Sequence, residues 1–274
     1  MNSNLNQSDK ISLVISDVDG TLINEEKILT ARTQEAVKKL QQANILFTVT
    51  SARPPFGLGM IINTLELKYP LGAFNGGILL KPNLDVIGCN PLPPAIIPEI
   101  MTLIESHGLN AWLCSDRQWY LKDPHGVHAD HHAKTLQCVP TVINSYQDIK
   151  DGIVKIVGVG KEVEAVARCE TAAQKQFESR LSATRSQPYY LDITQPNANK
   201  GTVVTRLAEH LSIPTSEIVT IGDNYNDIAM FERSGISIAM GNASEKVQAQ
   251  ATYVTTSNSE EGFANAMEGF VLNV

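Results

Sequence analysis

An alternation of apolar runs and amphipathic segments at both ends of the chain is the strongest constraint on its fold. Residues 11–18 form a β-branched, apolar run without polar alternation, which is typical of a buried parallel strand. Thr30 can cap the helical segment that follows, and residues 45–50 have the composition of a second strand. The pattern continues through a helix after Pro54 and a strand at 71–75. Strand, helix and strand in this order form a βαβ unit, which favours a parallel sheet.

The same alternation resumes near the end of the chain. Its predicted elements are a helix at 204–211, a strand at 217–223, a helix at 226–235, a strand at 236–240 and a helix at 244–251. We therefore expect an α/β fold whose core is a Rossmann-like, doubly wound parallel sheet. Ligands of such sheets sit beyond the carboxyl ends of the strands.

The middle of the chain differs in character, because it opens with a proline-rich stretch and surrounds one long helix with strand-like runs. The prolines are Pro91, Pro93, Pro94 and Pro98, the strand-like runs lie at 110–114, 118–121, 152–159 and 188–193, and the helix lies at 161–179. A module of about 100 residues is an ordinary domain size. We predict a core formed by residues 1–84 and 191–274, with an inserted α/β cap domain at 85–190.

Two acidic segments follow predicted strands of the core. Asp17 and Asp19 stand two residues apart at the end of the first strand, so both carboxylates can face one site. Asp223 and Asp227 follow the later strand, and the carboxyl ends of parallel strands open on the same edge of a sheet. Like charges this close resist ionisation without a counter-charge. A hard, oxygen-seeking cation supplies it, and Mg²⁺ fits best.

Given that metal, these residue types suit phosphoryl transfer. Asp17 can attack phosphorus as a covalent nucleophile, while Asp19 protonates the leaving oxygen and later activates water. Lys200, at a predicted helix start, can supply positive charge, and Ser51 can supply a hydroxyl. Taken singly, an Asp-x-Asp pair is more often a turn and Lys200 a surface residue. For Ser51, a functional role and a role as a helix cap before Pro54 have comparable weight.

Short motifs in a fixed order resemble those of the haloacid dehalogenase-like phosphatases, specifically their Cof-type branch. The motifs are DVDGTL at 17–22, SAR at 51–53, NGG at 75–77, NKG at 199–201, GDNYND at 222–227 and AMGNA at 239–243. The resemblance covers nearly the whole chain. Each motif is weak alone, but the ordered set is specific. The inserted module falls between the second and third main motifs, and the resemblance implies a cap there that closes over the substrate and sets specificity.

The resemblance also implies roles for single residues. Asp17 is expected to be the nucleophile and a metal ligand, and Asp19 to be the acid/base that offers its backbone carbonyl to Mg²⁺. Asp223 is expected to be the remaining main protein ligand, with Asp227 an accessory ligand or an orienting group. Phosphate is expected to be held by the amide of Val18, by Ser51, by the amide of Ala52, by Lys200 and by Asn226.

Two positions depart from the family pattern. Ser51-Ala52 stands where Thr-Gly is usual, and Tyr225 stands where a smaller or acidic residue is common. Serine keeps the hydroxyl, whereas alanine keeps the amide but adds a methyl group beside the phosphate. The first departure therefore bears on rate and fit more than on the class of reaction.

Other conspicuous side chains receive structural interpretations. His128 and His132, within the run at 125–132, are one helical turn apart, and we expect a solvated helix face or at most a cap contact with substrate instead of a second metal site. Arg53 and Arg117 could meet an anionic substrate, but exposed or structural roles are the default for both. The aromatic residues expected in the core of the cap are Trp112, Trp119, Tyr189 and Tyr190.

Composition narrows the class of partner. The chain of 274 residues has a net charge of −7, and its Lys and Arg residues are scattered, so it lacks the basic surface that nucleic-acid binding requires. It has no apolar tract long enough to span a membrane. The first ten residues lack the features of a secretory signal, and the four cysteines are far apart. We expect a cytoplasmic protein, a monomer or small homo-oligomer, with reduced thiols.

The predicted function is a Mg²⁺-dependent phosphatase that hydrolyses a small phosphorylated metabolite, either a sugar phosphate or a phosphorylated cofactor, through a phospho-aspartate. One alternative is a phosphomutase, which shares the aspartate pair but returns the phosphoryl group to its substrate. Another is a non-catalytic sensor that accepts phosphate in an acidic pocket. The presence of Asp19 disfavours the sensor, because a long-lived phospho-aspartate is best kept without a base at that position.

Overall fold

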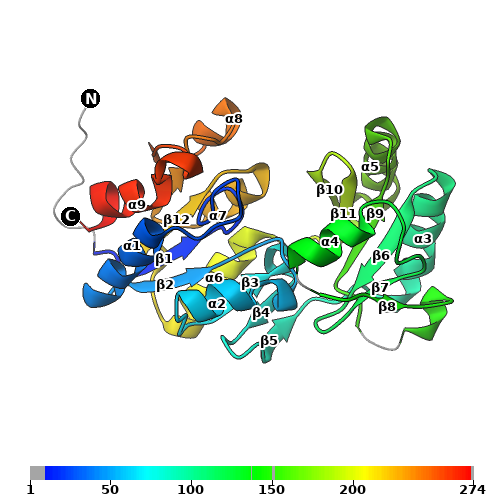
Figure 1. Cartoon of the computed structure of the whole chain (residues 1–274), viewed down its shortest axis with the longest axis horizontal. Helices are drawn as coiled ribbons and strands as arrows, with labels where there is room; N and C mark the ends of the chain where they lie inside the picture. Colours follow the sequence, from blue (N-terminus) through cyan, green and yellow to red (C-terminus); the bar gives the residue numbers. More distant parts are fainter. Residues whose placement is uncertain (1–9, 137, 150–151, 273–274) are drawn as a thin grey trace.

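A five-stranded sheet, parallel throughout, forms the centre of the first part of the molecule in the order β14-β13-β12-β1-β2 (Figure 1). Its strands are β1 (Leu13–Ser16), β2 (Leu46–Val49), β12 (Ile218–Gly222), β13 (Ile236–Ala239) and β14 (Tyr253–Val254). The computed structural model describes residues 10–136, 138–149 and 152–272, so most of the N-terminal segment examined for a secretory signal lies outside the described residues.

Helices cover both faces of this sheet, as the alternation of side chains along β1 requires. Val14 belongs to one buried cluster with residues of α1 and α9, whereas Leu13 and Ile15 belong to another with residues of α6 and α7. The helices are α1 (Ala31–Gln42), α2 (Gly59–Thr64), α6 (Lys200–Leu211), α7 (Ile228–Phe231), α8 (Glu245–Gln248) and α9 (Gly262–Ala266). This arrangement confirms the doubly wound α/β core.

A small antiparallel sheet extends the core. The predicted helix after Pro54 and the predicted strand at 71–75 are both present, but the antiparallel pairing of that strand was not predicted. The strands of this sheet are β3 (Leu71–Ala73), β4 (Ile78–Leu80) and β5 (Val86–Cys89). β3 meets the main sheet through a parallel bridge between Thr50 and Gly72. Positive φ values at Phe74 and Asn75 then turn the chain back on itself. At Gly76 a Cβ would lie 2.4 Å from the carbonyl oxygen of Asn199, so the close approach to α6 requires glycine.

The central part of the chain forms a six-stranded sheet in the order β10-β11-β9-β6-β7-β8, antiparallel except between β7 and β8. Its strands are β6 (Asn110–Cys114), β7 (Trp119–Leu121), β8 (Thr141–Val142), β9 (Lys155–Val159), β10 (Ser182–Gln187) and β11 (Tyr190–Thr194). Residues of α3 (Ile97–Ser106) and α5 (Val163–Phe177) share one buried cluster with this sheet, and α4 (Ala129–Leu136) follows β7. We call this part the inserted unit and the rest the core unit.

Two connections join the units, and they lie next to each other. The side chain of Gln195 donates a hydrogen bond to the carbonyl of Pro91 at 2.9 Å, which ties the outgoing segment to the returning one. β5 pairs with the core strand β4, and the whole of β11 pairs with β9. These pairings favour unit limits a few residues after the predicted positions 84 and 190; the division into domains itself stays a prediction.

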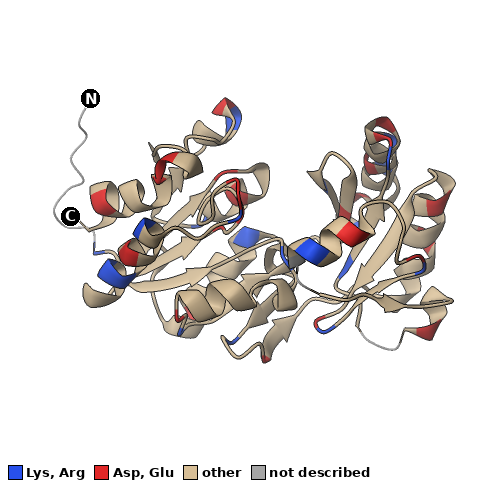
Figure 2. Cartoon of the chain, in the orientation of Figure 1, with Lys and Arg blue, Asp and Glu red and all other residues tan. Residues whose placement is uncertain are grey.

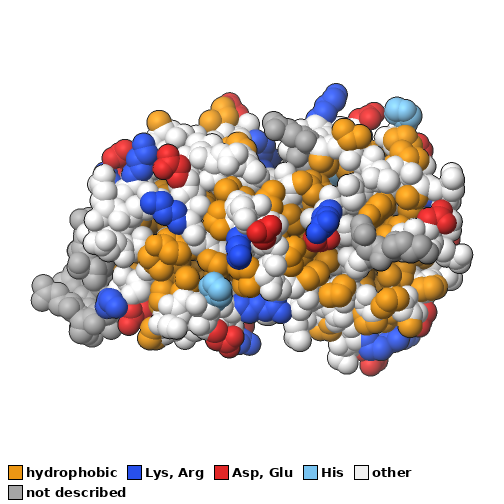
Figure 3. Space-filling view, turned by 90° about the horizontal axis from the view of Figure 1, so that it is seen from below, with side chains coloured by type: hydrophobic (Ala, Val, Ile, Leu, Met, Phe, Trp, Pro, Cys, Tyr) orange, Lys and Arg blue, Asp and Glu red, His pale blue; other side chains and the backbone are white. Residues whose placement is uncertain are grey.

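Charged residues are spread over both units (Figure 2). On the face shown in Figure 3, Lys and Arg side chains lie among acidic, apolar and uncharged ones. Among the described residues, no helix combines the length and the apolar character that a membrane crossing demands.

Candidate active site

Three carboxylates meet at the edge where the core strands end. β1 and β12 pair in parallel with Ser16 opposite Ile221, so the residues that follow each strand emerge side by side. One carboxylate oxygen from each of Asp17, Asp223 and Asp227 lies within 4.8 Å of the other two. We call these residues the carboxylate trio. The strand pairing predicted from the sequence therefore brings Asp17 and the second acidic segment together.

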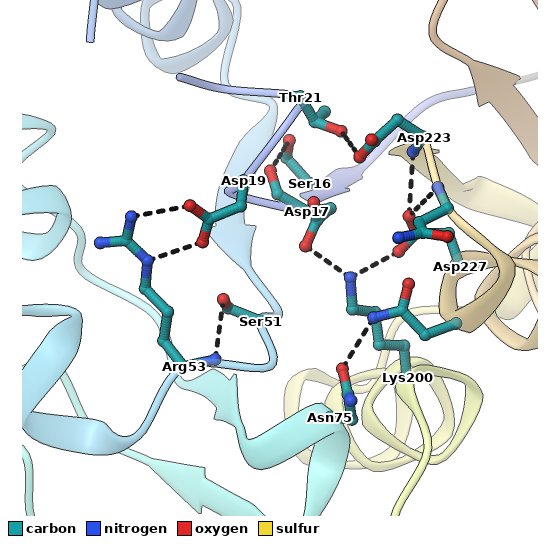
Figure 4. A network of polar contacts seen from close by, with 12 residues as sticks. Ser16, Asp17, Asp19, Thr21, Ser51, Arg53, Asn75, Lys200, Asp223 and Asp227 are labelled. Atoms are coloured by element: carbon teal, nitrogen blue, oxygen red, sulfur yellow. Dashed lines mark hydrogen bonds and ion pairs between the residues drawn. The ribbon is translucent and has the colours of Figure 1, made fainter. Parts of the chain in front are cut away.

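Lys200 connects two members of the trio from the first turn of α6. Its side chain is 1% exposed, and its Nζ donates hydrogen bonds to Asp17 Oδ1 at 2.5 Å and to Asp227 Oδ1 at 2.6 Å (Figure 4). Asn199 caps the helix by accepting a hydrogen bond from the amide of Thr202. Burial opposes the charge on Lys200, but Asp17 and Asp227 outweigh it and raise the pKa of the lysine. Lys200 is thus a fully enclosed cation, not a surface residue.

The loop after β12 is shaped around Asp227. Its Oδ2 accepts hydrogen bonds from the amides of Asp223 and Asn224, both at 2.9 Å, while its Oδ1 faces Lys200. A Cβ on Gly222 would lie 2.3 Å from the Cγ of Asp227, so only glycine fits there. Thr21 donates a hydrogen bond to Asp223 Oδ1 at 3.0 Å. These contacts hold the side chains of the trio in fixed positions.

The trio has more negative charge than Lys200 balances. Burial is the largest cause of a raised pKa at Asp17, with Lys200 acting against it and the neighbouring carboxylates adding to it. Burial, followed by the nearby Asp227, raises the pKa of Asp223 to about 6. An all-oxygen donor set with surplus negative charge fits a hard divalent cation such as Mg²⁺. Asp17, Asp223 and Asp227 are the side chains that would hold it.

Asp19 is not part of the trio, and its side chain turns toward Arg53 instead. Arg53 Nε and Nη2 donate to the two carboxylate oxygens at 2.7 and 2.9 Å (Figure 4). Lys27 Nζ lies 3.0 Å from Oδ1. Burial opposes ionisation of Asp19, but Arg53 and then Lys27 outweigh it, so its pKa is lowered. Arg53 is 10% exposed. Its pairing with Asp19 was missed, although it follows Ser51 and Ala52 directly in the SAR motif.

The residues predicted to hold phosphate lie around the trio. Ser51, buried at the end of β2, accepts a hydrogen bond from the amide of Arg53 at 3.1 Å, so its hydroxyl caps a local turn. Val18 is buried and follows Asp17 directly. Asn226 donates a hydrogen bond to Asn75 Oδ1 at 3.0 Å, a contact that was not foreseen although Asn75 opens the NGG motif.

A cavity of about 530 Å³ opens between the two units beside these residues. From the core unit it is lined by, among others, Asp17, Asp19, Ser51, Ala52, Arg53 and Asn226. From the inserted unit it is lined by residues of β7, α4, β9, β10 and β11. A molecule bound in this cavity would touch the nucleophile candidate at one end and the inserted unit at the other.

The histidine run packs against aromatic rings more than the predicted solvated face suggests. His128 stacks on Tyr189 with ring centroids 4.2 Å apart, and His132 lies 4.8 Å from Trp112. His131 is exposed, and both His131 and His132 line the cavity. Trp112, Trp119 and Tyr190 are buried as predicted, but Trp119, Tyr189 and Tyr190 also line the cavity.

Comparisons with known proteins identify relatives of this chain. A family model described as haloacid dehalogenase-like hydrolase matches residues 14–267. The chain is 30% identical over 258 residues to a Haemophilus influenzae protein named as a candidate phosphatase, covering 93% of this chain and 96% of that one. It is 24% identical to the 5-amino-6-(5-phospho-D-ribitylamino)uracil phosphatase YcsE of Bacillus subtilis, covering 96% of each chain.

A solved structure of a haloacid dehalogenase-like hydrolase from Bacteroides thetaiotaomicron has the same fold. It superposes on this chain with a TM-score of 0.86 at 26% identity, and the match covers 94% of this chain and 99% of that one. The match therefore includes the core unit and the inserted unit together.

Proposed function

The chain belongs to the haloacid dehalogenase-like hydrolases, and on that basis we propose that it is a Mg²⁺-dependent phosphatase of small phosphate monoesters that forms a phospho-aspartate on Asp17. The observation that carries this proposal is the position of Lys200 between Asp17 and Asp227, with Asp17 and Asp19 lining the same cavity. Nucleophile, cation and acid/base candidate then border one site.

The proposed reaction has two displacements. An oxygen of Asp17 forms a bond to phosphorus while the bond to the alcohol oxygen breaks, and Asp19, protonated after it has left Arg53, gives its proton to that oxygen. Water then attacks the phosphorus, Asp19 accepts the proton from the water, and the bond between phosphorus and Asp17 breaks. The products are the alcohol and free phosphate, and both aspartates return to their initial state.

Surrounding groups would stabilise the charge of the transferring phosphoryl group. Lys200 presents its ammonium group, and Ser51, Asn226 and the amides of Val18 and Ala52 are the proposed hydrogen-bond donors. Mg²⁺, when bound by the trio and by the backbone carbonyl of Asp19, would neutralise the phosphate oxygens and lower the repulsion between phosphate and Asp17.

Asp19 must leave Arg53 to act on the leaving oxygen. Arg53 lines the same cavity, so an arriving phosphate dianion can compete with Asp19 for its guanidinium group. Substrate binding would thereby release the acid/base from its ion pair. This exchange would bring Asp19 from its pairing with Arg53 to the leaving oxygen.

The proposed substrate is a sugar phosphate or a phosphorylated cofactor, and the cavity of about 530 Å³ suits a ligand of that size. We also propose that the enzyme is cytoplasmic and is a monomer or small homo-oligomer. The cytoplasmic location is supported by four free cysteines, which fit a reducing compartment: Cys89, Cys114, Cys138 and Cys169.

The test is phosphate release from sugar phosphates, nucleotides and phosphorylated vitamins, with Mg²⁺ and again with excess chelator. We expect release that depends on Mg²⁺ and that Asp17→Asn abolishes. Transfer of the phosphoryl group within the substrate without free phosphate would favour the mutase. A phosphoenzyme that persists for hours without turnover would favour the sensor.

A further inference from the structure

A buried ion pair forms part of the cavity wall in the inserted unit. Lys155 on β9 and Asp192 on β11 lie 2.8 Å apart between Nζ and Oδ2, with side chains 11% and 5% exposed. Lys155, Val157, Tyr190 and Asp192 alternate along the two strands and line the cavity, while Ile156 and Leu191 point to the core beneath α3 and α5. The cavity-facing side of this sheet therefore carries polar groups where a purely structural face would be apolar.

Three polar atoms on this wall have no hydrogen-bond partner among the residues that the structure describes. They are Trp119 Nε1, Tyr190 Oη and Asp192 Oδ1, in side chains of residues that are 2%, 8% and 4% exposed. Buried polar atoms are nearly always paired, because an unpaired one loses its bonds to water without replacement. Three of them on one wall of one cavity indicate that a bound molecule completes their hydrogen bonding.

The chemistry of the three atoms restricts that molecule. The indole Nε1 can only donate, the carboxylate oxygen of Asp192 can only accept, and the phenol of Tyr190 can do both. A hydroxyl group both donates and accepts, so adjacent hydroxyls can serve all three atoms. A group with acceptors alone would leave Asp192 unpaired.

Among the described residues, the cavity wall offers no Lys or Arg side chain that is free of an ion pair and could balance a second anionic group. In the described residues, each Lys and Arg side chain that lines the cavity is already in an ion pair: Lys27 and Arg53 with Asp19, Lys155 with Asp192, and Arg185 with Glu170. Burial, followed by the positive charge of Lys155, lowers the pKa of His132 to about 3, so this imidazole is neutral at working pH. A carboxylate or second phosphate here would meet Asp192 without a cation to balance it.

We propose that the inserted-unit end of the cavity is a subsite for a neutral, polyhydroxylated leaving group, in which the Asp192–Lys155 pair, Tyr190 and Trp119 read hydroxyls and disfavour a second anionic group. The proposal rests on the proposed phosphatase function and adds a selection rule to it. The phosphate lies at the trio, and the far end of the substrate carries hydroxyls and no charge.

The test compares substrates that differ at one end only. Sorbitol 6-phosphate and 6-phosphogluconate share a hydroxylated six-carbon chain, but the second ends in a carboxylate. Hexyl phosphate has the same length without hydroxyls. We expect kcat/KM for sorbitol 6-phosphate to exceed both others by at least about tenfold. Equal hydrolysis of sorbitol 6-phosphate and 6-phosphogluconate would overturn the proposal.

Variants separate the discrimination against charge from the recognition of hydroxyl groups. Asp192→Asn frees the charge of Lys155, so the preference for sorbitol 6-phosphate over 6-phosphogluconate should fall at least about tenfold or reverse. Tyr190→Phe and Trp119→Phe each remove one unpaired atom and should lower the preference over hexyl phosphate by about 2- to 10-fold. Glu99→Gln, which breaks an exposed pair with Arg180 away from the cavity, is the control and should keep both ratios.

A binding measurement keeps the two proposals apart. If no probe releases phosphate, the phosphatase proposal fails, but titration calorimetry still decides the subsite. Asp17→Asn should bind sorbitol 6-phosphate more tightly than 6-phosphogluconate by the same factor of at least about ten. Ratios that stay unchanged in all three wall variants would show that these residues do not read the substrate.

Discussion

Arg53 binds the carboxylate of Asp19 through two hydrogen bonds, of 2.7 Å from Nε and 2.9 Å from Nη2. The same guanidinium donates from Nη1 to the carbonyl of Gly57 at 3.1 Å, which fixes its orientation. The acid/base candidate is therefore held beside the trio but apart from it. The position of the Asp19 carboxylate depends on the planar guanidinium group of Arg53, so replacing that group should change the activity.

Arg53→Lys should lower kcat/KM about tenfold or more, because an ammonium group cannot reproduce the two-pronged contact with Asp19 or with phosphate. Steady-state kinetics with the best substrate of the panel would measure the loss, and circular dichroism would check the fold. Arg117→Lys is the matched control, since Arg117 is 84% exposed and should keep its activity. Unchanged kinetics in Arg53→Lys would exclude Arg53 from both roles.

Asp17→Asn should reduce turnover about 1,000-fold or more while the protein stays folded, because an amide cannot form the phospho-aspartate. The substitution also removes one negative charge from a crowded, buried site where the carboxyl resists ionisation. Thermal unfolding should therefore show little loss of stability. Asp130→Asn, at a side chain that is 74% exposed, serves as the control. Activity above a trace in Asp17→Asn would refute the nucleophile role.

Lys200→Met should destabilise the fold by about 3–5 kcal/mol, because it leaves Asp17 and Asp227 buried without their shared cation. Mg²⁺ should restore part of this loss by binding the trio, so the variant should gain more in melting temperature from Mg²⁺ than the wild type does. Calorimetric melting with and without Mg²⁺ measures both quantities. The prediction fails if Lys200→Met melts like the wild type in the absence of the metal.

His132→Gln should make the protein less sensitive to acid. The pKa of His132 is lowered to about 3 in the folded state by burial and by Lys155, so between about pH 3 and its ordinary value of 6.5 the unfolded chain binds a proton that the folded chain does not. Stability from this group is therefore complete above pH 6.5 and is lost as the pH falls toward 3, by at most about 1.4 kcal/mol per unit.

Urea unfolding at several pH values would test this. The free energy of unfolding of the wild type should fall faster than that of His132→Gln between pH 6.5 and pH 4. The control is His210→Gln, at an exposed side chain, and its free energy of unfolding should fall with pH as that of the wild type does. Parallel curves for the wild type and His132→Gln would contradict the burial effect.

Strand ends were the most predictable part of the site. An apolar, β-branched run that ends in an acidic residue fixes where a buried parallel strand stops, and neighbouring strands stop at the same edge. Asp17 and Asp223 could therefore be brought together from the sequence alone, and the Rossmann-like core follows from the same alternation. The cap of Thr30 on α1 was likewise readable from residue type, and its side chain accepts a hydrogen bond from the amide of Thr33.

Features that depend on side-chain direction or on distant contacts could not be predicted in this way. The turn of Asp19 toward Arg53 depends on where the loop after β2 places the guanidinium group. The reversal of the chain after β3 requires a positive φ at Phe74, and a phenylalanine does not predict that conformation. The burial of Lys200 comes from contacts with carboxylates on two separate segments, so a lysine at a helix start looks like a surface residue until the fold is known.

The pairing of β1 with β12 places Leu13 opposite Ile218, about 200 residues later in the chain. The six-stranded sheet of the inserted unit, by contrast, comes from one continuous stretch. During synthesis the N-terminal strands must wait until nearly the whole chain has left the ribosome before their central partner exists, whereas the inserted unit can pair its strands earlier. Folding of this molecule should thus begin in the middle of the chain and finish at its active-site edge, so that the acidic pocket is completed last.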